Sequence, residues 1–315
     1  MKTILITGAS GFVGSHLTDY LLAHSDAKIF GTYRGNKPER SGDRVHFVQV
    51  DLEKRTDVDQ LLADTKPDEI YHLAAQSNVP ASIKDPQGTF HANIDAQLHI
   101  FESLRAQGMT DTKVLLVSSG EVYGHIAPED LPVNELTPHR PANPYAVSKI
   151  AQDYLGFQYA LSYKMPIVRV RPFNHIGPRQ APTFVVSDFA KQVAEIEKGS
   201  KEAVIHVGNL DAKRDFTDVR DIVRLYALLM EKGVPSEVYN AGQGASRKVR
   251  EILDTLISLS EKEIRVEQDP TRMRPSDVPD IVADSSKAQN ATGWRPEIAF
   301  DETLKNILDY WRKIV

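Results

Sequence analysis

Cysteine is absent from the 315-residue chain, and so are long apolar runs. Without thiols there are no disulfides, no thiolate metal ligands and no cysteine nucleophile. No segment offers the roughly 20 apolar residues that a membrane-spanning helix needs. The apolar stretch Ile4–Ile6 near the N-terminus is also too short for a signal peptide. We therefore expect a cytoplasmic protein that does not enter a membrane.

An excess of positive charge is lacking as well. The chain has 38 Lys and Arg against 43 Asp and Glu, so its formal net charge is −5. This balance argues against a nucleic-acid or anionic-membrane partner, and any polyanion must be held by local arginines. The ten histidines, among them His72, His91 and His99, show no ligand spacing with carboxylates. We predict no metal site.

Predicted strands and helices alternate along the first half of the chain. Apolar strands are expected at 3–7, 28–33, 44–50, 69–74, 113–118 and 166–171, with helices at 12–22, 56–64, 88–107 and 144–163 between them. Most of these strands have no polar face, which is typical of a parallel sheet covered on both sides. We predict a Rossmann-type, doubly wound α/β domain over 1–172, to which the chain returns near 204–240, and a smaller C-terminal α/β domain over 173–315.

A glycine turn follows the first strand. In "GASGFVG" the glycines are Gly8, Gly11 and Gly14, and Phe12 and Val13 begin the next helix. A strand, a glycine turn and a helix in this order present backbone N–H groups to a pyrophosphate. The same spacing also occurs where a helix packs closely on a sheet, so the turn alone leaves a dinucleotide site and a tight corner both open.

The second strand ends at Tyr33-Arg34, where many NAD sites carry an Asp or Glu for the ribose 2′-hydroxyl. A carboxylate there would repel a 2′-phosphate, whereas an arginine can bind one through two hydrogen bonds. Arg34 therefore favours NADP(H), with NAD(H) as the alternative. The alternative interpretation is that Arg34 is an exposed arginine that binds no ligand.

Three further side chains suggest acid–base chemistry. Tyr145 and Lys149 in "PYAVSK" are four residues apart, so on a helix they share one face. A lysine ammonium beside the phenol would lower the tyrosine pKa from about 10 toward neutrality. Ser119 lies 26 residues before Tyr145, just after a predicted strand, where doubly wound folds place ligand contacts. Singly, the pair and the serine are also compatible with an ordinary helix and an ordinary turn.

Taken together, these motifs resemble the extended short-chain dehydrogenase/reductase family over essentially the whole chain. The resemblance rests on GxxGxxG, Asp51-Leu52, "HLAAQ" (72–76), "SSGEVYG" (118–124), "PYAVSK" (144–149), "RDFTDVRD" (214–221) and "GWRP" (293–296). It implies a catalytic triad of Ser119, Tyr145 and Lys149, with Lys149 also binding the nicotinamide ribose. It further implies that Asp51 and Leu52 approach the adenine and that Ala74 and Ala75 line the cofactor cleft.

Two loops narrow the resemblance to a branch of the family that acts on GDP-sugars. "RPFNHIGPRQ" (171–180) and "RMRPSDVPDIVADSSKA" (272–288) are similar to segments of GDP-mannose 4,6-dehydratases and GDP-6-deoxy-4-keto-mannose reductases. The resemblance implies that Asn174 touches the diphosphate or the sugar, that Arg274 and Arg214 bind phosphates, and that Asp277 binds the guanosine ribose. It also suggests a homodimer formed through the helices near 88–107 and 144–163.

Reduction and dehydration both start with hydride transfer at sugar C4, so the triad does not separate them. Dehydratases of the family carry Thr-Ser-Glu where this chain has Ser119-Gly120-Glu121. Glu121 favours dehydration, in which it would act as an acid or base. Gly120 and the shortness of the chain favour reduction, in which Glu121 would position a substrate hydroxyl. We favour NADPH-dependent reduction of GDP-4-keto-6-deoxy-D-mannose to GDP-D-rhamnose. GDP-mannose 4,6-dehydratase and a nucleotide-sugar epimerase are the alternatives.

Overall fold

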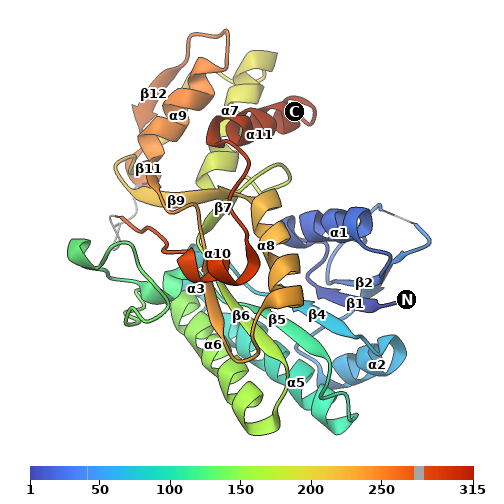
Figure 1. Cartoon of the computed structure of the whole chain (residues 1–315). Helices are drawn as coiled ribbons and strands as arrows, with labels where there is room; N and C mark the ends of the chain where they lie inside the picture. The colour runs from blue at the N-terminus through green and yellow to red at the C-terminus, as the bar shows by residue number, and fades with distance from the viewer. Residues whose placement is uncertain (41, 273–279) are drawn as a thin grey trace.

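The computed structural model describes residues 1–40, 42–272 and 280–315, and a parallel sheet of seven strands lies at its centre (Figure 1). The strand order is β10-β6-β5-β4-β1-β2-β3. The strands are β1 (Thr3–Thr7), β2 (Lys28–Tyr33), β3 (Val45–Gln49), β4 (Glu69–His72), β5 (Lys113–Val117), β6 (Ile167–Pro172) and β10 (Val238–Ala241). The predicted doubly wound α/β fold is confirmed, because the strand order reverses direction beside β1 and every pairing is parallel.

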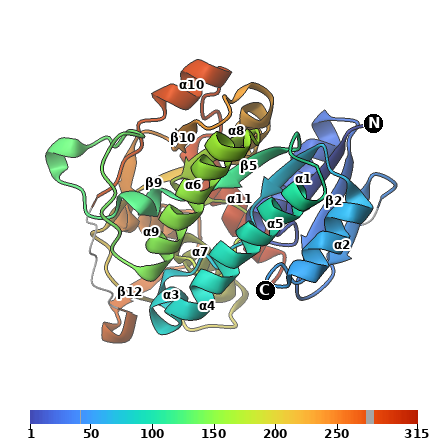
Figure 2. The same cartoon turned by 90° about the horizontal axis from the view of Figure 1, so that it is seen from below.

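Helices cover both faces of this sheet (Figure 2). One face carries α1 (Phe12–His24), α8 (Val219–Lys232) and α10 (Ser286–Thr292), and the other carries α2 (Arg55–Thr65), α5 (Ala96–Ala106) and α6 (Pro144–Tyr163). Successive residues of a strand point to opposite faces, so Ile4 and Ile6 pack on the α1 side and Leu5 on the α5 side. This double burial explains why the strands are apolar throughout.

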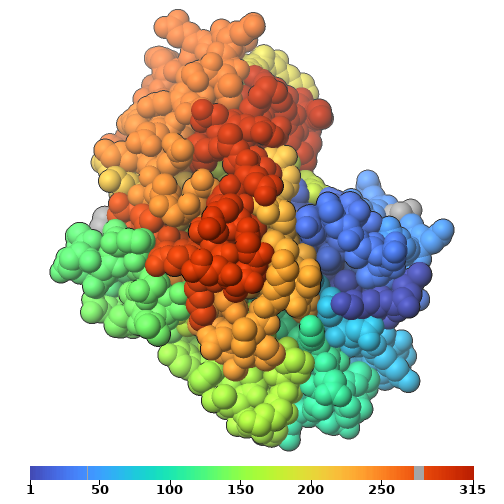
Figure 3. All heavy atoms as spheres, in the orientation of Figure 1, coloured from blue at the N-terminus to red at the C-terminus, as the bar shows by residue number. Residues whose placement is uncertain are grey.

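The C-terminal part of the chain builds a second lobe above the sheet in Figure 1. It contains a sheet of β7 (Asn174–Ile176), β9 (Lys213–Asp218) and β11 (Ser246–Lys248), and a pair of β8 (Val204–Val207) and β12 (Arg265–Gln268). Its helices are α7 (Val185–Lys198), α9 (Val249–Ser258) and α11 (Phe300–Arg312), which share one apolar core. The chain returns to the large sheet through α8 and β10, whereas β8 stays in the second lobe. In Figure 3 the segment around α10 runs down the front onto the lower lobe.

The helix expected at 88–107 is divided in the structure. It consists of α4 (Pro86–Phe90), a π-helical turn at His91–Asp95 and α5. Within the wide turn, the Asn93 amide accepts a hydrogen bond from Gln76 N at 2.7 Å and donates to Ser148 Oγ at 2.9 Å. The turn thus lets one helical side chain tie the loop after β4 to α6. π-turns of this kind are frequent beside functional sites.

Several short helical elements connect the larger ones. They are α3 (Val79–Lys84) and the 3₁₀ turns η2 (Gly120–Tyr123), η3 (Pro128–Asp130) and η4 (Pro270–Arg272). Among the described residues, no helix is both long and apolar enough to cross a membrane.

Candidate active site

A cavity of about 960 Å³ opens at the C-terminal edge of the large sheet, where it meets the second lobe. Its walls come from the ends of β1, β2, β4, β5 and β6 and from the first turns of α1 and α6. All the residues predicted to bind the cofactor line it, namely Gly8, Gly11, Phe12, Val13, Gly14, Arg34, Asp51, Leu52, Ala74, Ala75, Tyr145 and Lys149. Ser119, Glu121 and Asn174 line the same cavity. Residues from the whole first half of the chain therefore meet at one site.

The glycine turn fits a pyrophosphate. Gly8 has φ +71°, and a Cβ on Gly14 would lie 2.3 Å from the carbonyl oxygen of Gly8, so these two glycines allow α1 to pack on the turn. Gly11 caps α1 without a side-chain hydrogen bond, and the first turn of α1 carries no acidic residue. The first N–H groups of α1 thus border the cavity with no carboxylate to compete for them, which suits an anion.

The residue that follows β2, Arg34, carries a positive charge on the side of the cavity where the adenosine part of a dinucleotide would lie. The Arg34 side chain is 78% exposed and its guanidinium lies 3.1 Å from a carboxylate oxygen of Glu53. Both residues line the cavity. Arg34 therefore borders the cavity while it is paired with Glu53.

The three predicted catalytic residues come together from two elements. Tyr145 and Lys149 lie on one face of the first turns of α6, whose N-terminus is capped by Asn143 accepting from Ala146 N at 2.8 Å. Ser119 precedes η2, and its Oγ accepts a hydrogen bond from the N–H of Glu121 at 3.1 Å. The Ser119 side chain also forms a hydrogen bond with Tyr145.

Burial sets the protonation of this group. It raises the pKa of Tyr145 to about 12, while the hydrogen bond from Ser119 opposes this shift and the charge of Glu121 adds to it. The expectation that Lys149 lowers the tyrosine pKa is wrong for this structure. Burial lowers the pKa of Lys149 itself to about 7, and its Nζ donates to the Val117 carbonyl at 2.9 Å. Tyr145 therefore keeps its proton at neutral pH.

The residues predicted to bind the sugar nucleotide are found in three places. Asn174 begins β7 and lines the cavity. Arg214 lies on β9, outside the cavity lining, where burial lowers its pKa and the charges of Glu121 and Asp280 oppose that shift. The charge of Glu121 thus acts on Arg214 across the two lobes. Arg274 and Asp277 lie outside the described residues.

Sequence reasoning missed several residues of the cavity wall. The ring of His175 stacks on Phe12 of the glycine turn, with centroids 6.0 Å apart and planes 8° from parallel. Gln76 and Tyr226 also line the cavity. His175 lies in "RPFNHIGPRQ", one of the segments on which the resemblance rests, so the sequence could have indicated it as a site residue. Tyr226 lies in an ordinary amphipathic helix, whose pattern gives no such indication.

His72 lies beneath the site rather than in its wall. Its Nδ1 is 2.8 Å from Thr7 Oγ1, and burial, with a contribution from the charge of Lys149, lowers the pKa of His72 to about 3. The imidazole is therefore neutral. Over residues 1–40, 42–272 and 280–315, no group of three or more His, Asp and Glu side chains could hold a metal ion.

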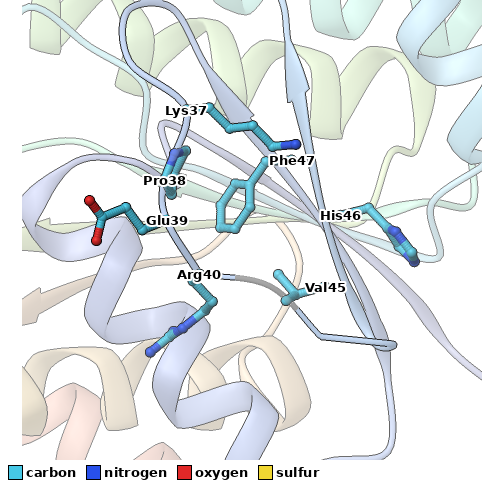
Figure 4. Close-up of a pocket in the computed structure, with 7 residues that line it drawn as sticks. All are labelled: Lys37, Pro38, Glu39, Arg40, Val45, His46 and Phe47. Carbon is cyan, nitrogen blue, oxygen red and sulfur yellow. The ribbon is translucent and has the colours of Figure 1, made fainter.

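A second hollow of about 480 Å³ lies between the segment after β2 and strand β3 (Figure 4). The ring of Phe47 faces Pro38 there, while His46 and Arg40 point away from it. None of the predicted site residues lines this hollow, so the large cavity is the candidate active site.

Comparison with known proteins agrees with this geometry. The family described as GDP-mannose 4,6 dehydratase matches residues 5–307. The chain belongs to this family. It is therefore a nucleotide-sugar enzyme of the extended short-chain dehydrogenase/reductase type, as the motifs indicated.

Members of the family with different activities are similar to the chain. The GDP-6-deoxy-D-mannose reductase of Pseudomonas aeruginosa is 36% identical over 100% of this chain and 98% of the relative. A GDP-mannose 4,6-dehydratase of Vibrio cholerae is 31% identical over 96% of this chain and 91% of the relative.

Two solved structures are similar over the whole fold. RMD from Pseudomonas aeruginosa, complexed with NADPH, has a TM-score of 0.89 at 34% identity and 100% coverage of both chains. The UDP-glucose 4-epimerase of Thermus thermophilus, in complex with NAD, has a TM-score of 0.87 at 30% identity, covering 99% of this chain and 100% of that one. These structures hold different nicotinamide cofactors on one fold.

Proposed function

We propose that the protein reduces the C4 keto group of GDP-4-keto-6-deoxy-D-mannose with NADPH, giving GDP-D-rhamnose. The observation that carries the proposal is that Ser119, Tyr145 and Lys149 border the same cavity as the glycine turn, and burial keeps the phenol of Tyr145 neutral at physiological pH. A neutral phenol is ready to donate a proton, as reduction of a ketone requires. An oxidation at C4 would first need a phenolate to accept one.

The mechanism assigns one task to each residue. Bound NADPH would supply the hydride that adds to C4. Ser119 and Tyr145 hydrogen-bond the C4 carbonyl oxygen, and Tyr145 transfers its proton to that oxygen as the C–H bond forms. Lys149, when protonated, stabilises the phenolate left on Tyr145 until a solvent proton replaces the one transferred. The products are the C4 alcohol and NADP⁺.

The cofactor is held by residues that already border the cavity. The first N–H groups of α1 would take the pyrophosphate, and Arg34 would take the 2′-phosphate. The NADPH complex of the similar Pseudomonas structure supports this choice, and the NAD complex of the epimerase keeps NAD(H) as an alternative.

Similar proteins and three described residues support a GDP-sugar substrate. The similar reductase matches the chain over its full length, which supports a GDP-sugar with a 4-keto group. Asn174 and Arg214 would bind its diphosphate or sugar from the side of the second lobe. Glu121, which interacts with both Tyr145 and Arg214, would accept a hydrogen bond from a sugar hydroxyl.

One observation favours a second function, GDP-mannose 4,6-dehydratase. Glu121 lines the cavity in the same turn as Ser119, where an acid–base group for elimination across C5–C6 would have to lie. Cofactor stoichiometry distinguishes the two reactions. With the 4-keto-6-deoxy sugar, the reductase consumes one NADPH per product. Conversion of GDP-mannose without net consumption of cofactor would instead establish the dehydratase.

We also propose that the protein is a homodimer formed through α6. Val147, Tyr154 and Leu161 are 43%, 53% and 50% exposed, and their spacing of seven residues places them in one stripe along the helix. Sedimentation at micromolar concentration tests this proposal, and charged substitutions in the stripe should yield a monomer.

A further inference from the structure

A buried network of polar side chains connects the two elements that carry the predicted catalytic residues, helix α6 and the turn η2. Its centre is Arg171 on β6, which is 3% exposed. The Nε of Arg171 donates to Asp153 Oδ2 at 2.7 Å, and its Nη1 donates to the hydroxyl of Tyr123 at 3.0 Å. One guanidinium therefore binds both a residue of α6 and the last residue of η2.

On the α6 side, the network ends at Asp153, one helical turn after Lys149. Tyr145, Lys149 and Asp153 follow one another at intervals of four residues, so they lie on one face of α6. Asp153 is fully buried, and its second carboxylate oxygen accepts from Arg169 of β6. Two arginines thus fix the rotation of the helix face that presents Tyr145 and Lys149.

On the other side, the network ends in the turn that holds the serine. η2 begins just after Ser119, contains Glu121 and ends at Tyr123. The Tyr123 hydroxyl donates to Asn240 Oδ1 on β10 at 2.6 Å while it accepts from Arg171. The phenol ring is fully buried, so both hydrogen bonds of this hydroxyl are made inside the protein.

Burial makes this network stiff. A charged group without water is stable only when its partners hold it in a good geometry, and such a network has few alternative arrangements. Asn240 extends it to the backbone, because its Nδ2 donates to the Val133 carbonyl at 3.0 Å. Neither Tyr123 nor Arg171 lines the cavity, so neither is placed to touch substrate or cofactor.

We propose that Tyr123 and Arg171 are positioning residues that keep Ser119 and Glu121 in register with Tyr145 and Lys149. The inference rests on the proposed reduction, in which Ser119 and Tyr145 act on the same carbonyl oxygen. Small displacements of such groups lower the rate of the chemical step more than they weaken binding.

The test is Tyr123→Phe, which removes the hydroxyl and keeps the ring. We expect kcat to fall about tenfold, with KM for NADPH and for the keto sugar changed less than about twofold. The matched control is Tyr239→Phe. Tyr239 is 2% exposed, and its hydroxyl accepts from Val234 N at 3.1 Å rather than from a residue of the network. An unchanged kcat in Tyr123→Phe, or an equal loss in Tyr239→Phe, overturns the proposal.

A second variant tests whether the two residues act together. Arg171→Lys keeps the charge but loses the forked donor, so it cannot bind Asp153 and Tyr123 as arginine does. The double variant with Arg171→Lys and Tyr123→Phe should have the same kcat as Arg171→Lys alone, because both changes break the same link. Additive losses would show that the residues act independently, contrary to the proposal.

Hydrogen–deuterium exchange gives a readout that needs no substrate. Exchange of the peptide spanning 118–124 should be faster in Tyr123→Phe than in the wild type and unchanged in Tyr239→Phe. If the wild-type protein does not reduce the keto sugar, the proposed function fails, and this exchange still decides the positioning role. Equal exchange in all three proteins would reject it.

Discussion

Asp153 lies one helical turn after Lys149 on the same buried face of α6, and its charge opposes the effect of burial on the Lys149 pKa. Burial dominates and lowers that pKa from 10.5 to about 7. Asp153 on the same helix is the charge that raises the Lys149 pKa. His72, whose own pKa is lowered by the charge of Lys149, is neutral, and Glu121 acts on Tyr145. The protonation of Lys149 is therefore adjustable near physiological pH.

The first prediction concerns the pH profile of reduction. Lys149 loses its charge as pH rises through about 7, whereas Tyr145 keeps its proton up to a pKa of about 12. Because a protonated Lys149 is needed to stabilise the phenolate, kcat should fall as pH rises through about 7. Steady-state rates at saturating substrate, measured from mildly acidic to alkaline pH, check this. A rate that stays the same over the whole range would contradict the assigned role of the lysine.

The second prediction is that Asp153→Asn moves this fall in kcat to lower pH. Without the carboxylate, nothing offsets burial, so the Lys149 pKa decreases further. We expect a shift of about one pH unit. Glu197→Gln, which breaks a remote ion pair with Arg312, is the control and should leave the midpoint unchanged. An unshifted midpoint in Asp153→Asn would mean that the alkaline fall does not report Lys149.

The third prediction separates chemistry from binding at Tyr145. Tyr145→Phe removes the proton donor and keeps the buried ring, so kcat should fall by about 10²- to 10⁴-fold. The dissociation constant for NADPH, measured by fluorescence, should change very little. Turnover close to that of the wild type would remove Tyr145 from the mechanism.

The fourth prediction uses the pair at the end of β2. Arg34→Ala should weaken NADPH binding about tenfold and NADH binding very little, because only NADPH carries the 2′-phosphate. Glu53→Gln should have the opposite effect and strengthen NADPH binding, since it releases Arg34 from the carboxylate 3.1 Å away. Titration calorimetry with both cofactors compares the two variants. Equal losses for NADPH and NADH in Arg34→Ala would contradict the phosphate role.

Much of the site could be predicted from the sequence, because parallel strands bring their C-terminal ends to one edge of the sheet. Gly8, Ala74 and Ser119 follow three different strands, and the fold alone places them around one cavity. The same rule locates Arg34 after β2. Motifs at strand ends therefore predicted which residues line this part of the cavity.

Other features depend on contacts that no local pattern records. The pKa of Tyr145 is set by burial, and the spacing of Tyr145 and Lys149 gave the opposite expectation. Arg171 and Tyr123 are 48 residues apart, and Tyr123 and Asn240 are 117 apart, so the network appears only when β5, β6 and β10 are placed side by side. The π-turn at Asn93 likewise follows from its bonds to Gln76 and Ser148.

The fifth prediction distinguishes two glycines of the same turn. A Cβ on Gly14 would lie 2.3 Å from the carbonyl oxygen of Gly8 and 2.7 Å from Ala9 Cα, which are backbone atoms and move only if α1 shifts. Gly14→Ala should therefore lower the free energy of unfolding by about 1–3 kcal/mol. A Cβ on Gly11 would meet the Gly8 carbonyl oxygen at 3.2 Å, and the backbone φ of −76° suits alanine.

Gly11→Ala should consequently leave the unfolding free energy within about 1 kcal/mol of the wild-type value. Because Gly11 borders the cavity at the start of α1, its new methyl group should instead weaken NADPH binding. Urea unfolding and cofactor titration of both variants measure the two effects separately. Equal destabilisation by the two substitutions would mean that the turn serves only helix packing, whereas loss of binding in a stably folded Gly11→Ala protein would assign Gly11 to the pyrophosphate site.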